Sequence, residues 1–344
     1  MNAFSSIVRR GHLAYKRRYA ARGLILIYHR IAEDPVDPWR LCVSPANFAR
    51  QLEIIRSLGF QPVWMSSLVD ALRARKLPRR SIAVTIDDGY RDNLDAARPI
   101  LERYQTPATH FATAGYIGSG EPFWWDALDQ ALLRPGRLPN VLEITLAGEQ
   151  HRWELGDDAV LEAGKEASWP EWRPFQPPPT RRHAIHDALW RLLASALPDD
   201  RQCAVRELLD QARASTVASA SARPMTEDEL RALRGDGLVE IGAHSLTHPA
   251  LSALPAPIQA HELHESKARL ERILGTEVRG CSYPQGRSSP EVQRAARAAG
   301  YDWACGSLPD AVGWRSNLFD LPRVSVRDWG EARFKTLLAH YIAH

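Results

Sequence analysis

The sequence lacks the features that identify several classes of protein. Its four cysteines are widely spaced and form no Cys-x-x-Cys pair, so we expect no zinc site built from thiolates. Free thiols in a reducing compartment fit this pattern best, with disulfides as the alternative. No apolar run is long enough to span a bilayer, and no export signal precedes the basic cluster at residues 16–18. Internal repeats and low-complexity segments are also missing.

Charge of one sign is also lacking. The chain has 44 Lys and Arg against 41 Asp and Glu, and a net charge of +3 indicates no polyanionic partner. The basic residues are spread out and form no recognition motif, so we expect no nucleic-acid partner. Residues 4–21 are the exception, because they are basic and mildly amphipathic. They form either a solvated helix or a segment that rests on an anionic membrane surface. We therefore expect a cytoplasmic protein, peripheral at the inner face of the membrane in the second case.

Short apolar strands alternate with amphipathic helices in two parts of the chain, residues 23–118 and 225–344. In the second part, Thr226 and Glu229 are spaced as a capping box at the start of a helix. Alternation of strands and helices predicts an α/β fold with a parallel sheet. The length allows either one barrel with an insertion or two domains.

The alternation stops between residues 119 and 224. Here the sequence predicts a hairpin about Gly148 and two helices, at residues 184–197 and 201–212. We expect this segment to be a mostly helical insertion, or cap, beside the mouth of the barrel. Residues 1–22 would be a separate basic N-terminal segment.

Two polar motifs each follow an apolar run that predicts a buried strand. The first is TIDDG at residues 85–89, and the second is HSLTHP at residues 244–249. Adjacent buried carboxylates repel each other and need a cation or hydrogen-bond donors. One Asp with two His is a common ligand set for a catalytic divalent metal, and α/β folds place such groups at strand ends. Taken singly, the first motif could be a turn with solvated acids, and the second could be two surface histidines whose spacing is accidental.

With these motifs and SYPQG at residues 282–286, the chain resembles the polysaccharide deacetylase family, also called the NodB homology domain or carbohydrate esterase family 4. The three motifs occur in the family's order. The family's usual Arg in the third motif is replaced by Ser282. The resemblance covers roughly residues 24–118 and 225–330 and implies a distorted (β/α)7-type barrel.

The resemblance and the residues agree on the central roles. Asp88, His244 and His248 would hold the metal, and zinc suits this nitrogen and oxygen set. Asp87 would stand beside the metal as the catalytic base. Pro249 disfavours helical geometry at His248, so we expect a loop there.

The third motif would stabilise the oxyanion. In the family a backbone amide of this motif is a donor, and here it maps to Gln285, after Pro284 has fixed the turn. Tyr283 would line the pocket. The Arg that orients the base must come from elsewhere, and Arg323 is our candidate, with an ordinary ion pair as the alternative.

The catalytic acid is predicted at the other end of the sequence. Tyr28 and His29 end the first predicted strand, and they resemble a circularly permuted subset of the family that carries its acid His in an N-terminal Tyr-His pair. In a closed barrel the first and last strands are neighbours, so a histidine on the first strand can reach the same site as one on the last strand. The alternative for His29 is a hydrogen-bonded core histidine.

These observations lead to one main hypothesis and two alternatives. We expect a metal-dependent hydrolase that removes N-acetyl groups from aminosugars of a polysaccharide or glycan precursor. One alternative is a deformylase or deacetylase of a lipid-linked aminosugar. The other is an inactive glycan-binding protein, although the retained Asp87, ligand set and His29 argue against it.

Overall fold

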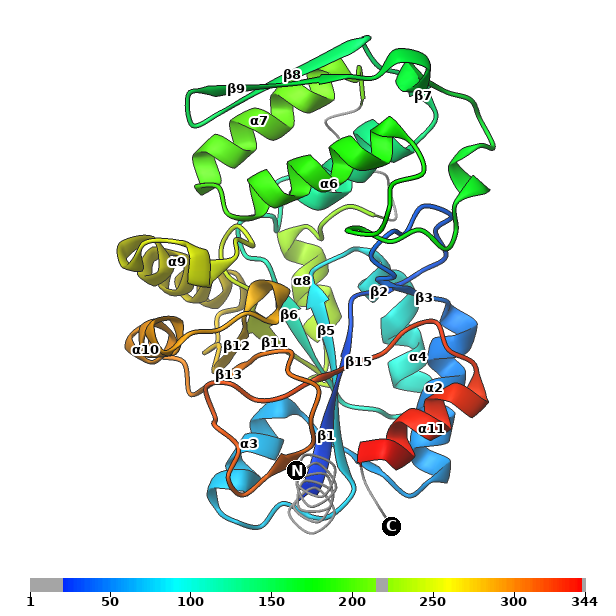
Figure 1. The fold of residues 1–344 in the computed structure, drawn as a ribbon. Coiled ribbons are helices and arrows are strands. Elements are labelled where there is room, and N and C mark those ends of the chain that lie inside the picture. The colour runs from blue at the N-terminus through cyan, green and yellow to red at the C-terminus, as the bar shows by residue number, and fades with distance from the viewer. Residues whose placement is uncertain (1–20, 215–221, 342–344) are drawn as a thin grey trace, which may run out of the picture.

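The computed structural model describes residues 21–214 and 222–341. The segment at residues 4–21, for which a solvated helix and a membrane-surface segment were the two alternatives, lies almost wholly outside them. A twisted sheet forms the centre of the molecule, helices cover it, and a second layer lies across one end (Figure 1). Among the described helices, none is long and apolar enough to cross a bilayer.

The central sheet is parallel along most of its width and curls into a distorted barrel. Its strands follow the order β1 (Ala21–Tyr28), β5 (Ser81–Asp88), β6 (Ala108–Ala112), β11 (Val239–Ala243), β12 (Gly280–Ser282) and β13 (Trp303–Cys305). Cys305 then forms a parallel bridge to Leu321, and the chain continues into β15 (Val324–Ser325), which pairs in parallel with β1. The first and last strands are therefore neighbours, and the α/β barrel expected from the sequence is confirmed.

Shorter strands extend this frame. β4 (Gln61–Pro62) pairs in parallel with β5, and β14 (Val312–Gly313) pairs antiparallel with β1. β2 (Arg30–Ile31) and β3 (Cys42–Val43) form a small parallel pair that holds the loop after β1.

The helices around the barrel begin and end where local signals place them. They are α2 (Pro45–Ser57), α3 (Met65–Arg73), α4 (Arg98–Arg103), α8 (Glu227–Arg234), α9 (Ala256–Leu274), α10 (Pro290–Ala298) and α11 (Glu331–Tyr341). The predicted capping box of Thr226 and Glu229 is present at the start of α8. A turn of π-helix, η1 (Asn93–Ala97), precedes α4 directly. Such turns occur often at functional sites.

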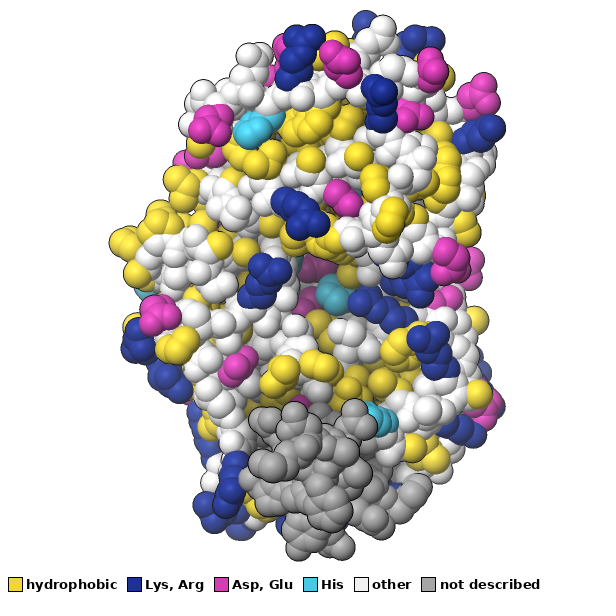
Figure 2. Space-filling view, in the orientation of Figure 1, with side chains coloured by type: hydrophobic (Ala, Val, Ile, Leu, Met, Phe, Trp, Pro, Cys, Tyr) yellow, Lys and Arg dark blue, Asp and Glu magenta, His cyan; other side chains and the backbone are white. Residues whose placement is uncertain are grey.

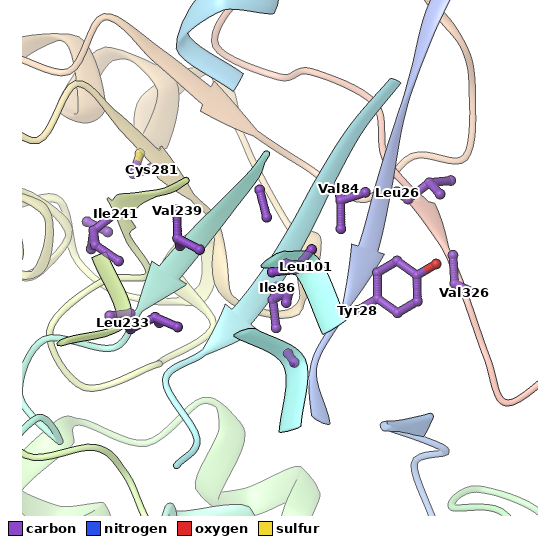
Figure 3. Packing of buried hydrophobic residues seen from close by; sticks show 14 of the residues in the cluster. Leu26, Tyr28, Val84, Ile86, Leu101, Leu233, Val239, Ile241, Cys281 and Val326 are labelled. Carbon is purple, nitrogen blue, oxygen red and sulfur yellow. The ribbon is translucent and has the colours of Figure 1, made fainter. Parts of the chain in front are cut away.

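The sheet buries side chains on both faces, as a parallel sheet covered by helices requires. Alternate residues of neighbouring strands build the larger core with the surrounding helices (Figure 3). Figure 3 labels Leu26, Tyr28, Val84, Ile86, Val239 and Ile241 among them. Residues of the opposite parity, such as Ile25 and Ala83, pack with α3 in a separate cluster. This parity decides which strand residues can reach the interior of the barrel.

The second layer comes from residues 119–214 and has its own hydrophobic cluster. It contains α5 (Trp124–Leu128), η2 (Asp129–Leu133), β8 (Val141–Leu146), β9 (Glu149–Glu154), α6 (Arg181–Ala194) and α7 (Pro198–Gln211). The strands β8 and β9 form the hairpin predicted about Gly148, and β7 (Gly136–Arg137) pairs with β10 (Val160–Leu161). Figure 1 shows this layer above the ends of β5 and β6. We call it the cap.

Candidate metal centre

Two adjacent carboxylates reach one cleft because the backbone changes direction between them. Asp87 has the parity of Thr85 and Ala83, whose side chains face the interior of the barrel. Asp88 would point to the opposite face if the strand continued. Its φ of 80° breaks the alternation, and Gly89 follows with a φ of 109°. Both Asp87 and Asp88 consequently line the same cleft.

The other side chains of the centre arrive from the neighbouring strands. The end of β6 lies between the first and second motifs, because Thr113 N–H donates to Asp88 O (2.9 Å) and His244 N–H donates to Ala112 O (2.8 Å). His244 therefore stands beside Asp88, although 156 residues of sequence separate them (244 minus 88). Strand pairing alone brings these two ligands together.

Asp88, His244 and His248 converge on one point. Asp88 Oδ1 lies 3.6 Å from Nε2 of His244 and 3.6 Å from Nε2 of His248. All three side chains are buried, and one ligating atom from each lies within 4.8 Å of the others. Asp88 Oδ1 is buried and has no hydrogen-bond partner among the described residues. A buried carboxylate oxygen without a donor is costly, so this arrangement fits a cation.

The loop that carries His248 is held in a strained conformation. Ser245 and His248 both have positive φ angles, of 59° and 58°, so the loop is not helical, as Pro249 led us to expect. The N–H groups of Leu246 and Thr247 donate to one oxygen of the buried Glu262 on α9, at 2.9 Å and 2.8 Å. These bonds attach the loop to α9.

The cap also contacts this loop. Arg201 on α7 donates from Nη2 to the carbonyl oxygen of Thr247 (2.7 Å). Trp125 on α5 packs against His248, with 4.3 Å between ring centroids. The loop is therefore held from both layers of the molecule.

The protonation states of this cluster favour metal binding. His244 Nδ1 lies 2.9 Å from the carbonyl oxygen of Ser282, so Nδ1 carries the proton and Nε2 offers its lone pair. Burial lowers the pKa of both His244 and His248, which keeps the imidazoles neutral. Burial and the charge of Asp87 raise the pKa of Asp88 well above its usual value. A dication would reverse this last effect, because it stabilises the ionised carboxylate. The donor set thus fits a divalent metal.

Asp87 is clamped as an anion. Arg323 donates from Nη1 and Nη2 to its two oxygens, at 2.7 Å and 2.8 Å, and both side chains are buried. Ser282 Oγ lies 3.2 Å from Asp87 Oδ2 and also contacts Arg323. Burial raises the pKa of Asp87, but the Arg323 guanidinium outweighs burial and holds it well below its usual range. Arg323 thus occupies the place that we expected for it, and Ser282 assists it, which sequence analysis did not foresee.

The third motif contributes its backbone turn rather than its aromatic ring. We expected Tyr283 to line the pocket, but its side chain is fully buried, and its hydroxyl donates to Phe319 O (2.9 Å). Pro284 is also buried, and Gln285 lines the cleft with a φ of 57°. Gly286 must be a glycine, since a Cβ there would lie 1.7 Å from Ser307 Oγ. The correction for Tyr283 follows from the direction of the strand, which turns its ring into the core.

His29 lies at the end of β1 and lines the same cleft. Its carbonyl accepts a hydrogen bond from Asn93, in the π-helical turn (3.1 Å). Burial lowers the pKa of His29 to about 3, while the charge of Asp87 acts in the opposite direction. The imidazole is therefore neutral in the protein without substrate.

The cleft that contains these groups has a volume of about 370 Å³. Figure 2 shows a hollow between the two layers, with acidic and histidine side chains inside and basic side chains around its rim. Sequence analysis missed Glu262, Arg201 and Trp125. No motif marks Glu262 or Arg201, because their contacts depend on how distant helices pack.

A sequence model described as Polysaccharide deacetylase matches residues 74–138 and 207–304, and these residues include all three motifs. Over these residues the chain resembles the polysaccharide deacetylase family, as its motifs led us to expect. The particular N-terminal arrangement expected for His29 stays a prediction.

Curated relatives match this chain over a limited region. The chain is 29% identical over 110 residues to the poly-beta-1,6-N-acetyl-D-glucosamine N-deacetylase of Escherichia coli K12, covering 31% of this chain and 16% of that protein. It is 28% identical over 102 residues to the putative polysaccharide deacetylase YxkH of Bacillus subtilis, covering 30% of this chain and 36% of that protein. The chain therefore matches well under half the length of either relative.

Solved structures resemble this protein over nearly the whole chain. IcaB from Ammonifex degensii has a TM-score of 0.57 and 16% identity, covering 95% of this chain and 99% of that one. The Streptococcus pyogenes deacetylase PplD, solved with acetate, has a TM-score of 0.55 and 16% identity, covering 90% and 94%. At this identity the likeness shows the shared fold.

Proposed function

We propose that this protein is a metal-dependent hydrolase that removes N-acetyl groups from aminosugars of a polysaccharide or glycan precursor. The observation that carries the proposal is the convergence of Asp88, His244 and His248 beside an ionised, clamped Asp87. The family and the names of the curated relatives support the same reaction.

Amide hydrolysis needs a nucleophilic water, a polarised carbonyl and a proton for the leaving amine. When bound, a divalent ion, most suitably zinc, would supply Lewis acidity and lower the pKa of a bound water. Asp87 takes a proton from the attacking water, and Arg323 keeps its carboxylate ionised and oriented. The turn at Gln285 offers its backbone amide to the oxyanion.

His29 gives a proton to the leaving amine in this scheme. Because its pKa is about 3 in the protein alone, His29 must acquire a proton within the substrate complex before it can act as the acid. Its position in the cleft and next to the charge of Asp87 supports the assignment.

The test is mass spectrometry of N-acetylated and N-formylated glycans after incubation with zinc-loaded protein. We expect release of acetate, and we expect Asp87→Asn to lower kcat/KM by about 10²–10⁴-fold while zinc stays bound. Asp95→Asn, an exposed carboxylate paired with Arg91, is the matched control and should keep full activity.

Other outcomes would replace the proposal. Release of formate alone would favour the deformylase. Glycan binding without any release would show an inactive binding protein. An active, zinc-loaded Asp87→Asn protein would remove Asp87 from the role of base.

A further inference from the structure

A row of aromatic rings leads away from the metal centre into the cap. Next to His248 lies Trp125, and Trp124 follows with a centroid distance of 5.6 Å to Trp125. Trp190 on α6 then lies 5.9 Å from Trp124. All of these rings line the cleft of the metal centre. The row therefore extends from His248 to a part of the same cleft that lies farther from the metal centre.

Three rings form the outer end of this row, namely Trp39, Phe175 and Trp190. Trp39 lies 4.9 Å from Trp190, and Phe175 lies 5.4 Å from Trp190 and 5.8 Å from Trp39. Phe175 is 45% exposed, and the other two are half-buried. All three lie outside the stretches matched by the family model. They are separate from the groups that act on the amide.

Polar contacts hold two of the three outer residues, Phe175 and Trp39. Phe175 has a φ of 70°, donates its N–H to Asp187 (2.9 Å), and carries the Arg191 guanidinium 4.0 Å from its ring centroid. The carbonyl oxygen of Trp39 accepts a hydrogen bond from Arg327 (3.0 Å). Exposed rings held in this way are pre-organised, and exposed apolar surface beside a cleft marks a binding site.

Polar atoms beside the rings indicate what kind of molecule fits. Trp39 Nε1 and both polar side-chain atoms of Gln285 are buried and have no hydrogen-bond partner among the described residues. Trp39 and Gln285 both line this cleft. A hydrocarbon chain would leave such groups unpaired, which is costly. A sugar ring offers an apolar face for the indoles and hydroxyl groups for the donors and acceptor.

We propose that Trp39, Phe175 and Trp190 form a stacking platform for a pyranose ring, the one next to the sugar that loses its acetyl group. The proposal rests on the proposed function and names its substrate class as a glycan of at least two sugar units. Several ring-to-ring steps separate the platform from His248, so it contacts a part of the substrate other than the acetamido group.

Binding can be measured without turnover. Zinc-loaded Asp87→Asn protein is titrated with N-acetylglucosamine, with its β-1,4- and β-1,6-linked trimers, and with farnesyl phosphate, using calorimetry and tryptophan fluorescence. We expect at least one trimer to bind about tenfold more tightly than the monosaccharide, and Trp190→Ala to remove this advantage. Trp190→Phe should retain most of it because it keeps an aromatic face. Trp153→Ala, on the outer hairpin, is the control and should bind like the parent.

Equal binding of trimer and monosaccharide, or a trimer advantage that survives in Trp190→Ala, would overturn the platform. Farnesyl phosphate binding that is lost in Trp190→Ala, with sugar binding unchanged, would assign the rings to a lipid instead. Thermal unfolding of each variant shows whether it folds, and Phe175→Ala provides a second, exposed position.

The same variants separate this proposal from the proposed function. In protein with Asp87 intact, Trp190→Ala should raise KM for the trimer about tenfold and change kcat little, because the lost contact is made equally before and during the reaction. If no glycan releases acetate but the trimer advantage holds, the platform stands and the proposed activity fails.

Discussion

The barrel end and the cap enclose the same cleft, but they are built differently. On the barrel side, buried polar groups are held by several short hydrogen bonds, as Asp87 is by Arg323 and Ser282. On the cap side, the cleft wall is made of aromatic rings in contact with one another. Hydrogen-bonded charges fix positions to fractions of an ångström, as proton transfer requires. Ring contacts tolerate variation in the partner, which suits substrate selection. Under the two proposals, the barrel performs the chemistry and the cap selects the substrate.

The largest expected effect is the loss of a metal ligand on the barrel side. Asp88→Ala should abolish the zinc-dependent rise in melting temperature. In the parent protein, zinc at about 100 times its Kd stabilises the fold by about 2.7 kcal/mol. Differential scanning calorimetry with and without zinc measures both. His264→Ala, an exposed histidine on α9, is the control and should keep the full shift. A zinc shift that persists in Asp88→Ala would exclude this site.

Removal of the clamp on Asp87 should have the next largest effect. Arg323→Gln leaves a buried carboxylate without its partner, which costs about 3–5 kcal/mol of stability as measured by urea unfolding. Arg279→Gln breaks partly exposed ion pairs with Asp70 and Asp302 and should cost under about 1 kcal/mol.

Arg323→Gln should also change how stability and kcat/KM depend on pH, and the direction follows from the pKa of Asp87. Arg323 lowers the pKa of Asp87 in the folded protein, so the stability that it provides is present above the unfolded pKa of an Asp and is lost as the pH falls. In Arg323→Gln this pKa rises, so the acid limb of the kcat/KM profile should move to higher pH. An unchanged acid limb would show that Asp87 is not the group that titrates.

The smallest effect tests the boundary between the two regions, because the loop of His248 is held from both. Glu262→Gln on the barrel side and Arg201→Met on the cap side should each weaken zinc binding by about 10–100-fold, as measured by competition with a chelating dye. Glu265→Gln, exposed on the same helix as Glu262, is the control. If Arg201→Met leaves zinc affinity unchanged, the cap takes no part in the metal centre, and the division between chemistry and selection becomes sharper.

Local signals predicted much of the fold. The capping box at Thr226 and the hairpin about Gly148 formed as expected, since both depend on residues close in sequence. The predicted direction of Tyr283 was wrong, because a residue next to a bend can turn either way, and here its ring enters the core, where its hydroxyl donates to the Phe319 carbonyl. Arg323 could be named as a candidate but not chosen over an ordinary ion pair, since it lies 236 residues from Asp87.

The sequence by itself determined the types of the candidate ligands and their order, with two acids at the end of one strand and two histidines after another. The tertiary structure alone decided that Asp88 turns back into the cleft, that Arg323 pairs with Asp87, and that rings from three distant segments form one wall. The physical reason is that motifs are set by neighbours along the chain, whereas burial, charge pairing and ring contact are set by neighbours in space.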